Sequence, residues 1–370
     1  MKVIMLSTDH RAFEEGSNVR LRFLDYGSIV DELHIIVFSK EGDLAKEQIA
    51  QNVWLYPIKS KNRLIALSQI RSIAKSFENI DIVSAQDPFE TGVVGLYLSK
   101  SLGSSFHVQV HTNFLSTHFA KLSKMNAWRV HIAGFVLPRA DCVRTVSRRV
   151  QKSIYEKYTL KTEPVVLPVF VDSMAIKHAV PTKDIHGRYS RFDFVFLMVS
   201  RLEREKDISL AVRAMRSVVK EHPKAGLVIV GSGSEGKKLQ KYINKSGLQD
   251  TVILEQWNTD VISYYKTADV FINTSRYEGY GRTLIEAASA GCPIITTDVG
   301  IVGDILDRED IFVCNVGGIK CVEKSIRMAI EEEEMRKEKA LRALRSISMH
   351  ASESKEEYLA RYRHMLESCM

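Results

Sequence analysis

The sequence lacks the hydrophobic segments of a membrane protein. No apolar run approaches the ~18–20 residues that cross a bilayer, and the stretch Cys292–Gly300 already contains Thr296, Thr297 and Asp298. Near the N-terminus, Lys2 is followed by only Val3–Leu6 before polar residues begin, which is too short for the core of a signal peptide. These absences exclude a membrane-spanning chain and favour a cytoplasmic location.

Cysteine is also scarce. The five cysteines, at positions 142, 292, 314, 321 and 369, are an odd number without metal-ligand spacing, so we predict five reduced thiols and no zinc site. Repeats and low-complexity tracts are absent too. With 45% hydrophobic and 26% charged residues, the composition excludes a disordered or fibrous protein.

Basic charge is concentrated in the first half. Residues 1–180 carry 23 Lys and Arg against 17 Asp and Glu, whereas the rest of the chain carries 29 against 28. Residues 59–77 contain no acid beside Lys59, Lys61, Arg63, Arg71 and Lys75. Residues 121–152 contain only Asp141 against Lys121, Lys124, Arg129, Arg139, Arg144, Arg148, Arg149 and Lys152. We predict peripheral binding to an anionic membrane surface and no nucleic-acid partner; the alternative is that these helices pack their apolar faces on their own sheet.

Short apolar runs alternate with helix-length amphipathic stretches, which predicts parallel sheets covered by helices. The expected strands are Val3–Leu6, Leu33–Phe38, Val53–Tyr56, Ile82–Ala85, His107–His111, Val143–Val146, Phe194–Met198, Leu227–Val230, Val252–Leu254, Val270–Asn273, Ile294–Thr297 and Ile311–Cys314. The alternation is interrupted near Pro168–Asp193. We therefore predict an α/β protein with two doubly wound, Rossmann-like domains, 1–170 and 171–350, and a C-terminal helix, 351–370, packing back on the first. Ligands of such folds bind beyond the carboxyl ends of strands, so a cleft between the domains is the expected site.

Three motifs in the second half carry the candidate chemistry. Arg201 and Lys206 follow a strand and suit a diphosphate. Gly231–Gly236 matches G-x-G-x-x-G between a strand and a helix, with Glu255 about 20 residues on, as in a dinucleotide site. In the third motif, Gly279 and Gly281 lie between a strand and a helix N-terminus, where backbone N–H groups bind anions, and Glu278 and Glu286 flank them.

These residues resemble the retaining nucleotide-sugar glycosyltransferases of the GT-B fold, the group 1 glycosyltransferases. The resemblance is strongest over residues 190–315. It is carried by Arg201 and Lys206, by the seven residues between Glu278 and Glu286, and by the segments Ala268–Ser275 and Ala288–Ile295.

The resemblance implies a role for each candidate residue. Arg201 and Lys206 hold the donor diphosphate, Glu286 binds the ribose, and Glu278 contacts the donor sugar as a catalytic residue. His111, which ends an expected strand of the first domain, is the second catalytic candidate because the family has a sugar-contacting histidine in this region. The predicted donor- and phosphate-binding set also includes Gly279, Tyr280, Gly281, Arg282, Thr283 and Gly16, and Gly231 and Gly233 lie near the nucleoside.

The sequence departs from the family at several positions. Glu14 and Glu15 precede Gly16 where the family has a glycine pair, and Asp207 follows Lys206 where glycine is common. Val169-Phe170 replaces the usual Asn-Gly, and Arg282 replaces an aliphatic residue. These changes leave the identity of the donor open.

The predicted function is transfer of a hexose-type sugar from a UDP- or GDP-sugar to a hydroxyl of a glycan or lipid-linked acceptor. The sequence contains no Asp-x-Asp, the motif with which many transferases hold a divalent ion, so we predict no metal and no other cofactor. Arg201, Lys206 and the helix N-terminus after Gly281 would stabilise the leaving diphosphate instead. Two alternatives remain: an NAD-dependent oxidoreductase that uses Gly231–Gly236, and a non-catalytic membrane or nucleic-acid binder.

Overall fold

A computed structural model describes residues 1–38, 44–58 and 63–370, with the backbone alone for 63–67. Lys59 and Lys61 of the first basic stretch lie outside the described residues. The chain divides into two compact units. The first comprises Met1–Pro168 and Ser354–Met370, and the second comprises Val169–Glu353. The sequence had placed these boundaries after residues 170 and 350.

The first unit is built on one sheet, which has eight strands in the described residues, in the order β3-β4-β2-β1-β5-β6-β7-β8. All neighbours are parallel except β3 and β4. The strands are β1 (Lys2–Ser7), β2 (Glu32–Phe38), β3 (Glu47–Ala50), β4 (Val53–Ile58), β5 (Ile82–Ala85), β6 (Ser105–Val110), β7 (Cys142–Thr145) and β8 (Val165–Val166). The central strands β1, β2 and β5 are buried and mostly apolar, as expected where helices cover both faces of a parallel sheet, whereas β6 and β7 also bury the polar residues His107, Gln109 and Arg144.

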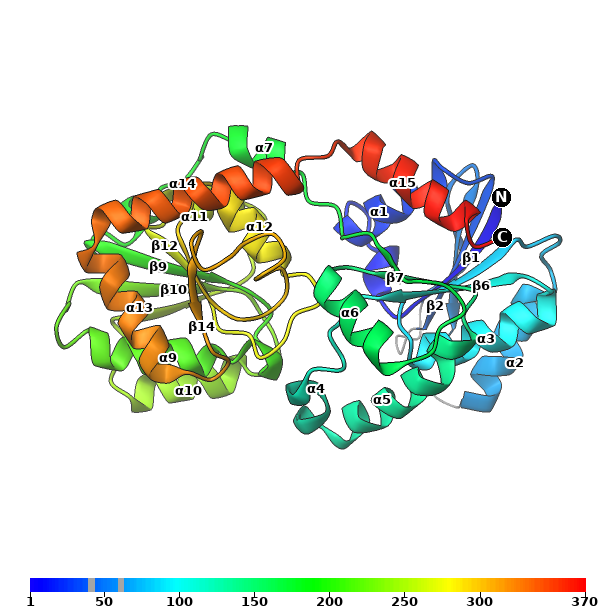
Figure 1. Ribbon diagram of the computed structural model, residues 1–370, viewed down its shortest axis with the longest axis horizontal. Helices are drawn as coiled ribbons and strands as arrows, with labels where there is room; N and C mark the ends of the chain where they lie inside the picture. Colours follow the sequence, from blue (N-terminus) through cyan, green and yellow to red (C-terminus); the bar gives the residue numbers. More distant parts are fainter. Residues whose placement is uncertain (39–43, 59–62) are drawn as a thin grey trace. The chain divides into compact units, whose positions relative to one another are not determined.

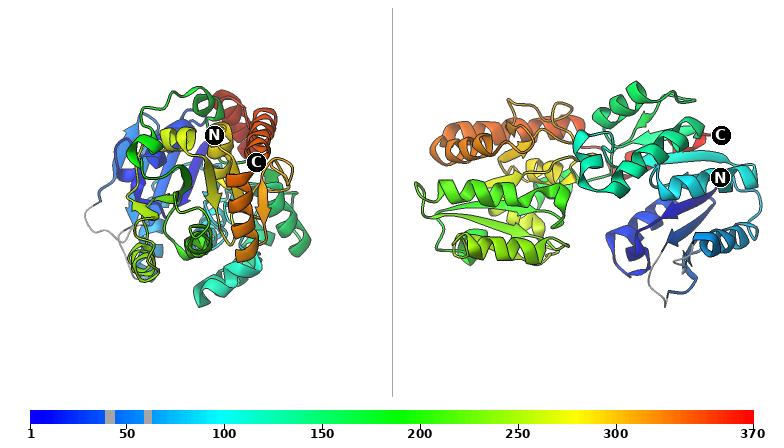
Figure 2. Two further views of the ribbon diagram at one scale, coloured as in Figure 1. Left: turned by 90° about the vertical axis from the view of Figure 1, so that its left-hand side faces the viewer. Right: turned by 90° about the horizontal axis from the view of Figure 1, so that it is seen from below.

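Helices lie on both sides of this sheet (Figures 1 and 2). They are α1 (Asn18–Gly27), α2 (Arg63–Ala74), α3 (Glu90–Leu102), α4 (Thr117–Leu122), α5 (Lys124–Val136), α6 (Arg148–Lys157) and α15 (Lys355–Glu367), with 3₁₀ turns η1 (His10–Phe13) and η2 (Leu137–Arg139). Ile70 of α2 and Leu98 of α3 share an apolar core with Ile4, Ile36 and Val83 of the strands. The C-terminal helix α15 begins with a capping box between Ser354 and Glu357, which satisfies two N-terminal backbone donors.

The second unit contains a parallel sheet with the strand order β11-β10-β9-β12-β13-β14. Its strands are β9 (Phe194–Val199), β10 (Ala225–Val230), β11 (Val252–Glu255), β12 (Val270–Asn273), β13 (Ile294–Thr297) and β14 (Phe312–Cys314). Its helices are α7 (Ser173–His178), α8 (Ile185–Arg188), α9 (Ile208–Val218), α10 (Gly236–Lys245), α11 (Val261–Thr267), α12 (Arg282–Ser289), α13 (Ile319–Glu331) and α14 (Glu333–His350), with the 3₁₀ turn η3 (Arg204–Lys206). Helices α9, α10 and α13 bury an apolar core against one face, and α11, α12 and α14 lie on the other (Figure 1).

The predicted α/β architecture with two parallel-sheet domains is confirmed. Each of the expected strands is present, whereas the sequence missed β3 and β8. Both missed strands lie at sheet edges, and β8 has only two residues, so neither has the long apolar run that marks a buried strand. No helix in the described part of the chain is long and apolar enough to span a membrane.

The prediction of five reduced thiols is wrong. The structure pairs Cys142 with Cys369 and Cys314 with Cys321 as disulfides, with Cα–Cα distances of 5.5 and 5.6 Å, and leaves Cys292 free and buried. Cys142 and Cys369 are 227 residues apart in sequence. Their proximity depends on α15 returning to the first unit, which cysteine spacing does not reveal.

Candidate functional site

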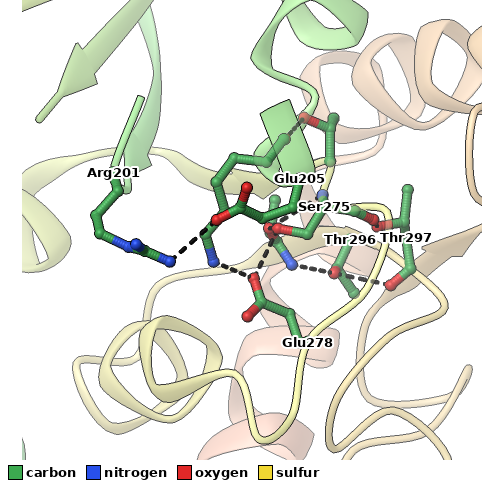
Figure 3. Close-up of polar contacts among 9 residues, drawn as sticks. Arg201, Glu205, Ser275, Glu278, Thr296 and Thr297 are labelled. Carbon is green, nitrogen blue, oxygen red and sulfur yellow. Dashed lines mark hydrogen bonds and ion pairs between the residues drawn. The ribbon is translucent and has the colours of Figure 1, made fainter. Parts of the chain in front are cut away.

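The carboxyl end of β9 presents two cations to a polar cluster (Figure 3). Arg201 has a side chain that is 74% exposed, and its Nη2 lies 3.0 Å from Oε1 of Glu205. Lys206 ends the short turn η3, and its side chain is only 16% exposed. One cation therefore reaches solvent for a ligand, while the other is held inside the cluster.

Glu278 pairs with Lys206, the less exposed of the two cations. Its Oε1 lies 2.5 Å from Nζ of Lys206 and 2.7 Å from the hydroxyl of Ser275. The Glu278 side chain is 14% exposed, so water screens this ion pair weakly. The pair brings together two residues that are 72 positions apart, because β9 and β12 are neighbours in the sheet.

A chain of buried polar groups lies beside Glu278 and continues from Ser275 to Thr296 and Thr297 (Figure 3). The Ser275 hydroxyl lies 2.7 Å from Oδ1 of Asn273, whose Nδ2 donates to the Thr296 hydroxyl at 3.1 Å. The Thr297 hydroxyl donates to the carbonyl oxygen of Ser275 at 2.6 Å. These bonds join the ends of β12 and β13 and fix the backbone from which Glu278 projects.

The turn between Glu278 and α12 is shaped by glycine. Gly281 has φ of +93° and stands directly before the first residue of α12. Gly300 approaches this turn so closely that a Cβ on it would lie 2.3 Å from the carbonyl oxygen of Tyr280. That carbonyl accepts a bond from the Ile301 amide at 3.0 Å, and the Tyr280 side chain is buried. The turn thus offers a ligand backbone N–H groups at a helix N-terminus, and the Tyr280 phenol is not part of that surface.

Glu286 lies one turn into α12 with a mostly buried carboxylate. Its Oε2 accepts from the Tyr265 hydroxyl at 3.2 Å, and its Oε1 lies 3.4 Å from Nη2 of Arg282. Burial raises the pKa of Glu286, and the positive charge of Arg282 offsets part of that rise. A carboxylate that is poorly solvated in the free protein is suited to accept hydrogen bonds from ligand hydroxyls.

The glycines of the G-x-G-x-x-G motif are explained by packing. A Cβ on Gly231 would lie 1.9 Å from the carbonyl oxygen of Ser200, and one on Gly233 would lie 2.5 Å from that of Leu202. Glu255, which a dinucleotide site needs for the ribose, already accepts from Tyr264 at 2.8 Å and also binds Tyr189. The oxidoreductase alternative therefore gains no support.

His111 and Gly16 belong to the first unit. His111 follows β6, is exposed, and has Nε2 3.2 Å from Oε1 of Gln109. Part of the residue is exposed, but its Nε2 contact is part-buried, and desolvation by the surrounding protein atoms, followed by the charge of Arg144, lowers the pKa of His111 well below its ordinary value. Gly16 has φ of +75° in an exposed loop beside the exposed carboxylates of Glu14 and Glu15.

Comparison with known proteins follows the same division of the chain. Residues 187–343 match the family described as "Glycosyl transferases group 1", and residues 31–173 match "Glycosyltransferase Family 4". The first match contains the Lys206–Glu278 pair and the whole of α12. The segment that holds this site, residues 187–343, belongs to the group 1 glycosyltransferases.

Two curated relatives and one solved structure place this glycosyltransferase among known proteins. An uncharacterized glycosyltransferase of Methanocaldococcus jannaschii is 25% identical over 276 residues, 70% of this chain and 66% of that protein. The alpha-monoglucosyldiacylglycerol synthase of Streptococcus pneumoniae is 26% identical over 240 residues, 62% of this chain and 54% of that enzyme. The chain thus spans between half and two thirds of these relatives. A crystal structure of Anabaena HepE with UDP and glucose has a TM-score of 0.78 at 18% identity, covering 100% of both chains. The predicted GT-B fold is confirmed.

Within the second unit, the structure brings most of the predicted residues of this glycosyltransferase to one end of the sheet. Two ion pairs, Lys206–Glu278 and Arg282–Glu286, lie around the start of α12, whereas Gly231 and Gly233 pack on the loop after β9.

Two residues of the site were not predicted from the sequence: Ser275 as a partner of Glu278, and Gly300 as the support of the turn. The Ser-x-x-Glu spacing hinted at the first, whereas no local signal marked Gly300. No group of three or more His, Cys, Asp or Glu in the described residues is arranged to hold a metal ion.

The departure at Asp207 has a structural explanation. Its φ is +41°, a left-handed conformation that glycine adopts without strain and Asp tolerates better than most residues. The buried Asp207 carboxylate pairs with Nε of Arg276 at 3.0 Å and accepts from the Ser209 hydroxyl at 3.0 Å. Asp207 therefore replaces the usual glycine and adds an ion pair beside Lys206.

The left-handed backbone and the ion pair of Asp207 predict the order of stability of two variants at this position. Asp207→Ala loses the ion pair and places a Cβ-bearing residue without local hydrogen bonds at positive φ, so we expect a loss of roughly 2–4 kcal/mol. Asp207→Gly loses the same pair without backbone strain and should be more stable than the alanine variant by about 1 kcal/mol. Thermal and urea unfolding midpoints measure the order. An alanine variant at least as stable as the glycine variant contradicts the explanation.

Proposed function

We propose that this protein transfers a hexose-type sugar from a UDP- or GDP-sugar to a hydroxyl group of a glycan or lipid-linked acceptor, with retention of anomeric configuration and without a metal ion. The observation that carries the proposal is the Lys206–Glu278 ion pair beside the start of α12. In this proposal the Lys206 ammonium binds the diphosphate and the Glu278 carboxylate faces the sugar. Both residues lie next to the turn that leads into α12, whose N-terminal N–H groups favour an anion.

The chemistry of the leaving group supports this proposal. Breaking a sugar–phosphate bond leaves negative charge on the diphosphate and positive charge on the sugar. Lys206 has three N–H donors, of which one serves Glu278, so others remain for phosphate oxygens. Arg201 adds an exposed guanidinium, and the backbone after Gly281 adds the helix N-terminus. Glu278 would face the positive charge that develops on the sugar.

The relatives support the substrate classes. The pneumococcal relative is named for a glucosylated diacylglycerol, and HepE was crystallised with UDP and glucose. We therefore favour a UDP-hexose and a lipid-linked acceptor as the first pair to test. Hydrolysis and transfer assays with a panel of UDP- and GDP-sugars test the donor. Binding of NAD in preference to a nucleoside diphosphate would contradict the proposal.

Transfer should not need a divalent ion. Because Arg201, Lys206 and the α12 N-terminus supply the positive potential, we expect activity in EDTA to stay within about twofold of that in buffer. Rates measured with EDTA, and then with added magnesium or manganese, check this expectation. Activity that disappears in EDTA and returns with either ion contradicts the metal-free assignment.

We also propose that α5 docks on an anionic membrane surface. Met125, Trp128 and Phe135 lie on one face of α5 and are 51%, 69% and 50% exposed. Exposed Lys121, Lys124 and Arg139 flank them, and Arg139 lies 4.1 Å from the ring centre of Phe135. Aromatic side chains among cations are typical of helices at lipid headgroups. Two of the residues predicted for this basic surface do not contribute a free cation to it. Arg144 is fully buried, and Arg129 pairs with Glu90.

Vesicle co-sedimentation tests this surface. We expect binding to phosphatidylglycerol vesicles that weakens at high salt, and little binding to phosphatidylcholine vesicles. Replacing Trp128 and Phe135 together by Ala should weaken binding roughly 10- to 100-fold, since both rings lose apolar burial. Leu341→Ala, at an exposed apolar residue of α14, is the matched control. Equal recovery with neutral vesicles contradicts the proposal.

A further inference from the structure

Arg144 of β7 is a buried cation with an unusual set of partners. It is 0% exposed, and its Nε donates to the carbonyl oxygen of Leu167 at 2.9 Å. Its Nη2 donates to the carbonyl oxygen of Pro168 at 2.7 Å and to the Tyr358 hydroxyl at 2.8 Å. The guanidinium lies 4.9 Å from the ring centre of Tyr362. These partners are neutral, so carbonyl dipoles, a phenol and a ring face stabilise the charge in place of a carboxylate.

Arg144 decides the orientation of the Gln109 side chain. Its Nη1 lies 2.9 Å from the terminal atom of Gln109 that the structure assigns as Oε1. A guanidinium only donates hydrogen bonds, so this atom must be the oxygen. The amide nitrogen then faces the Ser84 and Tyr362 hydroxyls, each at 3.1 Å. Every polar atom of the Gln109 side chain is therefore assigned by its neighbours.

The same oxygen determines which nitrogen of His111 carries the proton. Nε2 of His111 lies 3.2 Å from Oε1 of Gln109. An amide oxygen only accepts, so the contact is a hydrogen bond only when Nε2 carries the proton. The neutral imidazole then has a lone pair on Nδ1, which accepts a hydrogen bond from a hydroxyl group.

We propose that Gln109 and Arg144 are positioning residues that hold His111 as the Nε2–H tautomer, which deepens the proposed function because it rests on His111 as a partner of the donor sugar. Arg144 orients the amide, and the amide oxygen orients the imidazole and stabilises the tautomer that carries its proton on Nε2. The lone pair on Nδ1 of His111 is then available to accept a hydrogen bond from a sugar hydroxyl throughout the reaction.

Helix α15 is the outer support of this arrangement. Tyr358 and Tyr362 of α15 supply one hydroxyl to Arg144 and one to Gln109. Tyr26 of α1 stacks on Tyr362 with ring centres 4.3 Å apart, and α1 and α15 lie in the same unit (Figure 1). The return of the C-terminal segment to the first unit therefore contributes directly to the surroundings of His111.

The charges that act on His111 favour its neutral form. They are the cations Arg144 of β7 and Arg22 of α1, and the third titratable neighbour is His107 of β6. Burial, followed by the charge of Arg144, lowers the pKa of His107 to about 3, so His107 stays neutral. With Arg144 and Arg22 both positive, protonation of His111 would add a third positive charge.

Nuclear magnetic resonance of the full chain with ¹⁵N-labelled histidine tests the tautomer without any assay of activity. The His111→Gln variant identifies the His111 signals by their loss. We expect the Nε2–H tautomer in the neutral imidazole, and protonation of His111 only at a pH below its ordinary pKa. An Nδ1–H tautomer, or protonation of His111 near its ordinary pKa, overturns the proposal.

Two variants of Gln109 test its role. Gln109→Glu keeps both acceptor contacts but adds a negative charge, so His111 should protonate at least about one pH unit higher and the acid limb of kcat should move with it. Gln109→Met removes the amide, so His111 should show mixed tautomers and kcat should fall roughly 10-fold or more, with the donor KM within about twofold. Gln48→Met, on the edge strand β3, is the control. If Gln109→Met does not fold, Tyr362→Phe takes its place. It removes only one hydroxyl, so it should produce the same changes more weakly.

The results separate this inference from the proposed function. If Gln109→Met leaves the His111 tautomer unchanged, positioning by Gln109 is wrong whatever the activity. If the tautomer behaves as expected while His111→Ala keeps full kcat/KM, the imidazole is positioned as proposed but has no role in transfer. That second outcome overturns the catalytic part of the inference and leaves the donor site of the second unit untouched.

Discussion

Lys206→Ala should lower kcat/KM about 30- to 1000-fold. Removing the ammonium takes away a charged hydrogen bond to the diphosphate, which costs about 2–4 kcal/mol in the transition state. It also leaves the carboxylate of Glu278, which is 14% exposed, without its cation. An unpaired carboxylate beside a diphosphate adds repulsion to the loss of attraction, so this substitution should have one of the largest effects in the chain.

Two further variants separate these contributions. Combining Lys206→Ala with Glu278→Gln removes the uncompensated negative charge. Glu278→Gln should therefore lower kcat/KM less in the Lys206→Ala background than it does in the wild type. Lys237→Ala removes an exposed lysine from α10 of the same unit and should leave kcat/KM unchanged. Kinetics with the preferred donor measure all three. If Lys206→Ala stays within threefold of the wild type, Lys206 does not hold the diphosphate.

The fold was predictable because it depends on local patterns. Buried parallel strands such as Val195–Val199 are continuous apolar runs, and amphipathic helices separate them, so the alternation is visible in the sequence. Features that depend on distant segments were not visible. The antiparallel edge strand Glu47–Ala50 has no buried residue, and the pairing of Cys142 with Cys369 requires the chain to return to the first unit.

The site was predictable only where its residues belong to one motif. Glu278, Gly281 and Glu286 stand close in sequence, and one turn and one helix place them. The contact of Lys206 with Glu278 depends on the order of β9 and β12 in the sheet, which adjacent letters do not reveal. The buried Arg144 was mistaken for a surface cation because its carbonyl and phenol partners have no charge to reveal them.

Glu278→Gln and Glu286→Gln should affect different kinetic constants. Glu286 is on α12 and is proposed to accept from ribose hydroxyls, which are the same in the ground and transition states, so its loss should mainly raise the donor KM. Glu278 is in the turn, where positive charge on the sugar develops only as the bond breaks. Its loss should chiefly lower kcat, by about 100-fold or more.

The two glutamates should also differ in stability. Burial raises the pKa of Glu286, so the folded protein keeps this proton to higher pH than the unfolded chain does. Stability is therefore lost as the pH rises from the unfolded pKa, about 4, towards the folded one, and glutamine avoids this loss. Glu286→Gln should raise the melting temperature at pH 8, with a gain that shrinks towards pH 4. Glu278→Gln should give no such gain, because it leaves Lys206 without its carboxylate.

Steady-state kinetics and melting curves on the same samples distinguish this assignment from a purely structural role. As surface or helix-terminus charges, both residues would be worth about 0.3–1 kcal/mol of stability and nothing in kinetics. Glu334→Gln, in the first turn of α14 with a side chain that is 93% exposed, is the control for that case. If both site variants keep wild-type kcat/KM, as this control should, the assignment of the donor site to Glu278 and Glu286 is wrong. A rise in KM for Glu286→Gln with a fall in kcat for Glu278→Gln is the result that only the proposed roles produce.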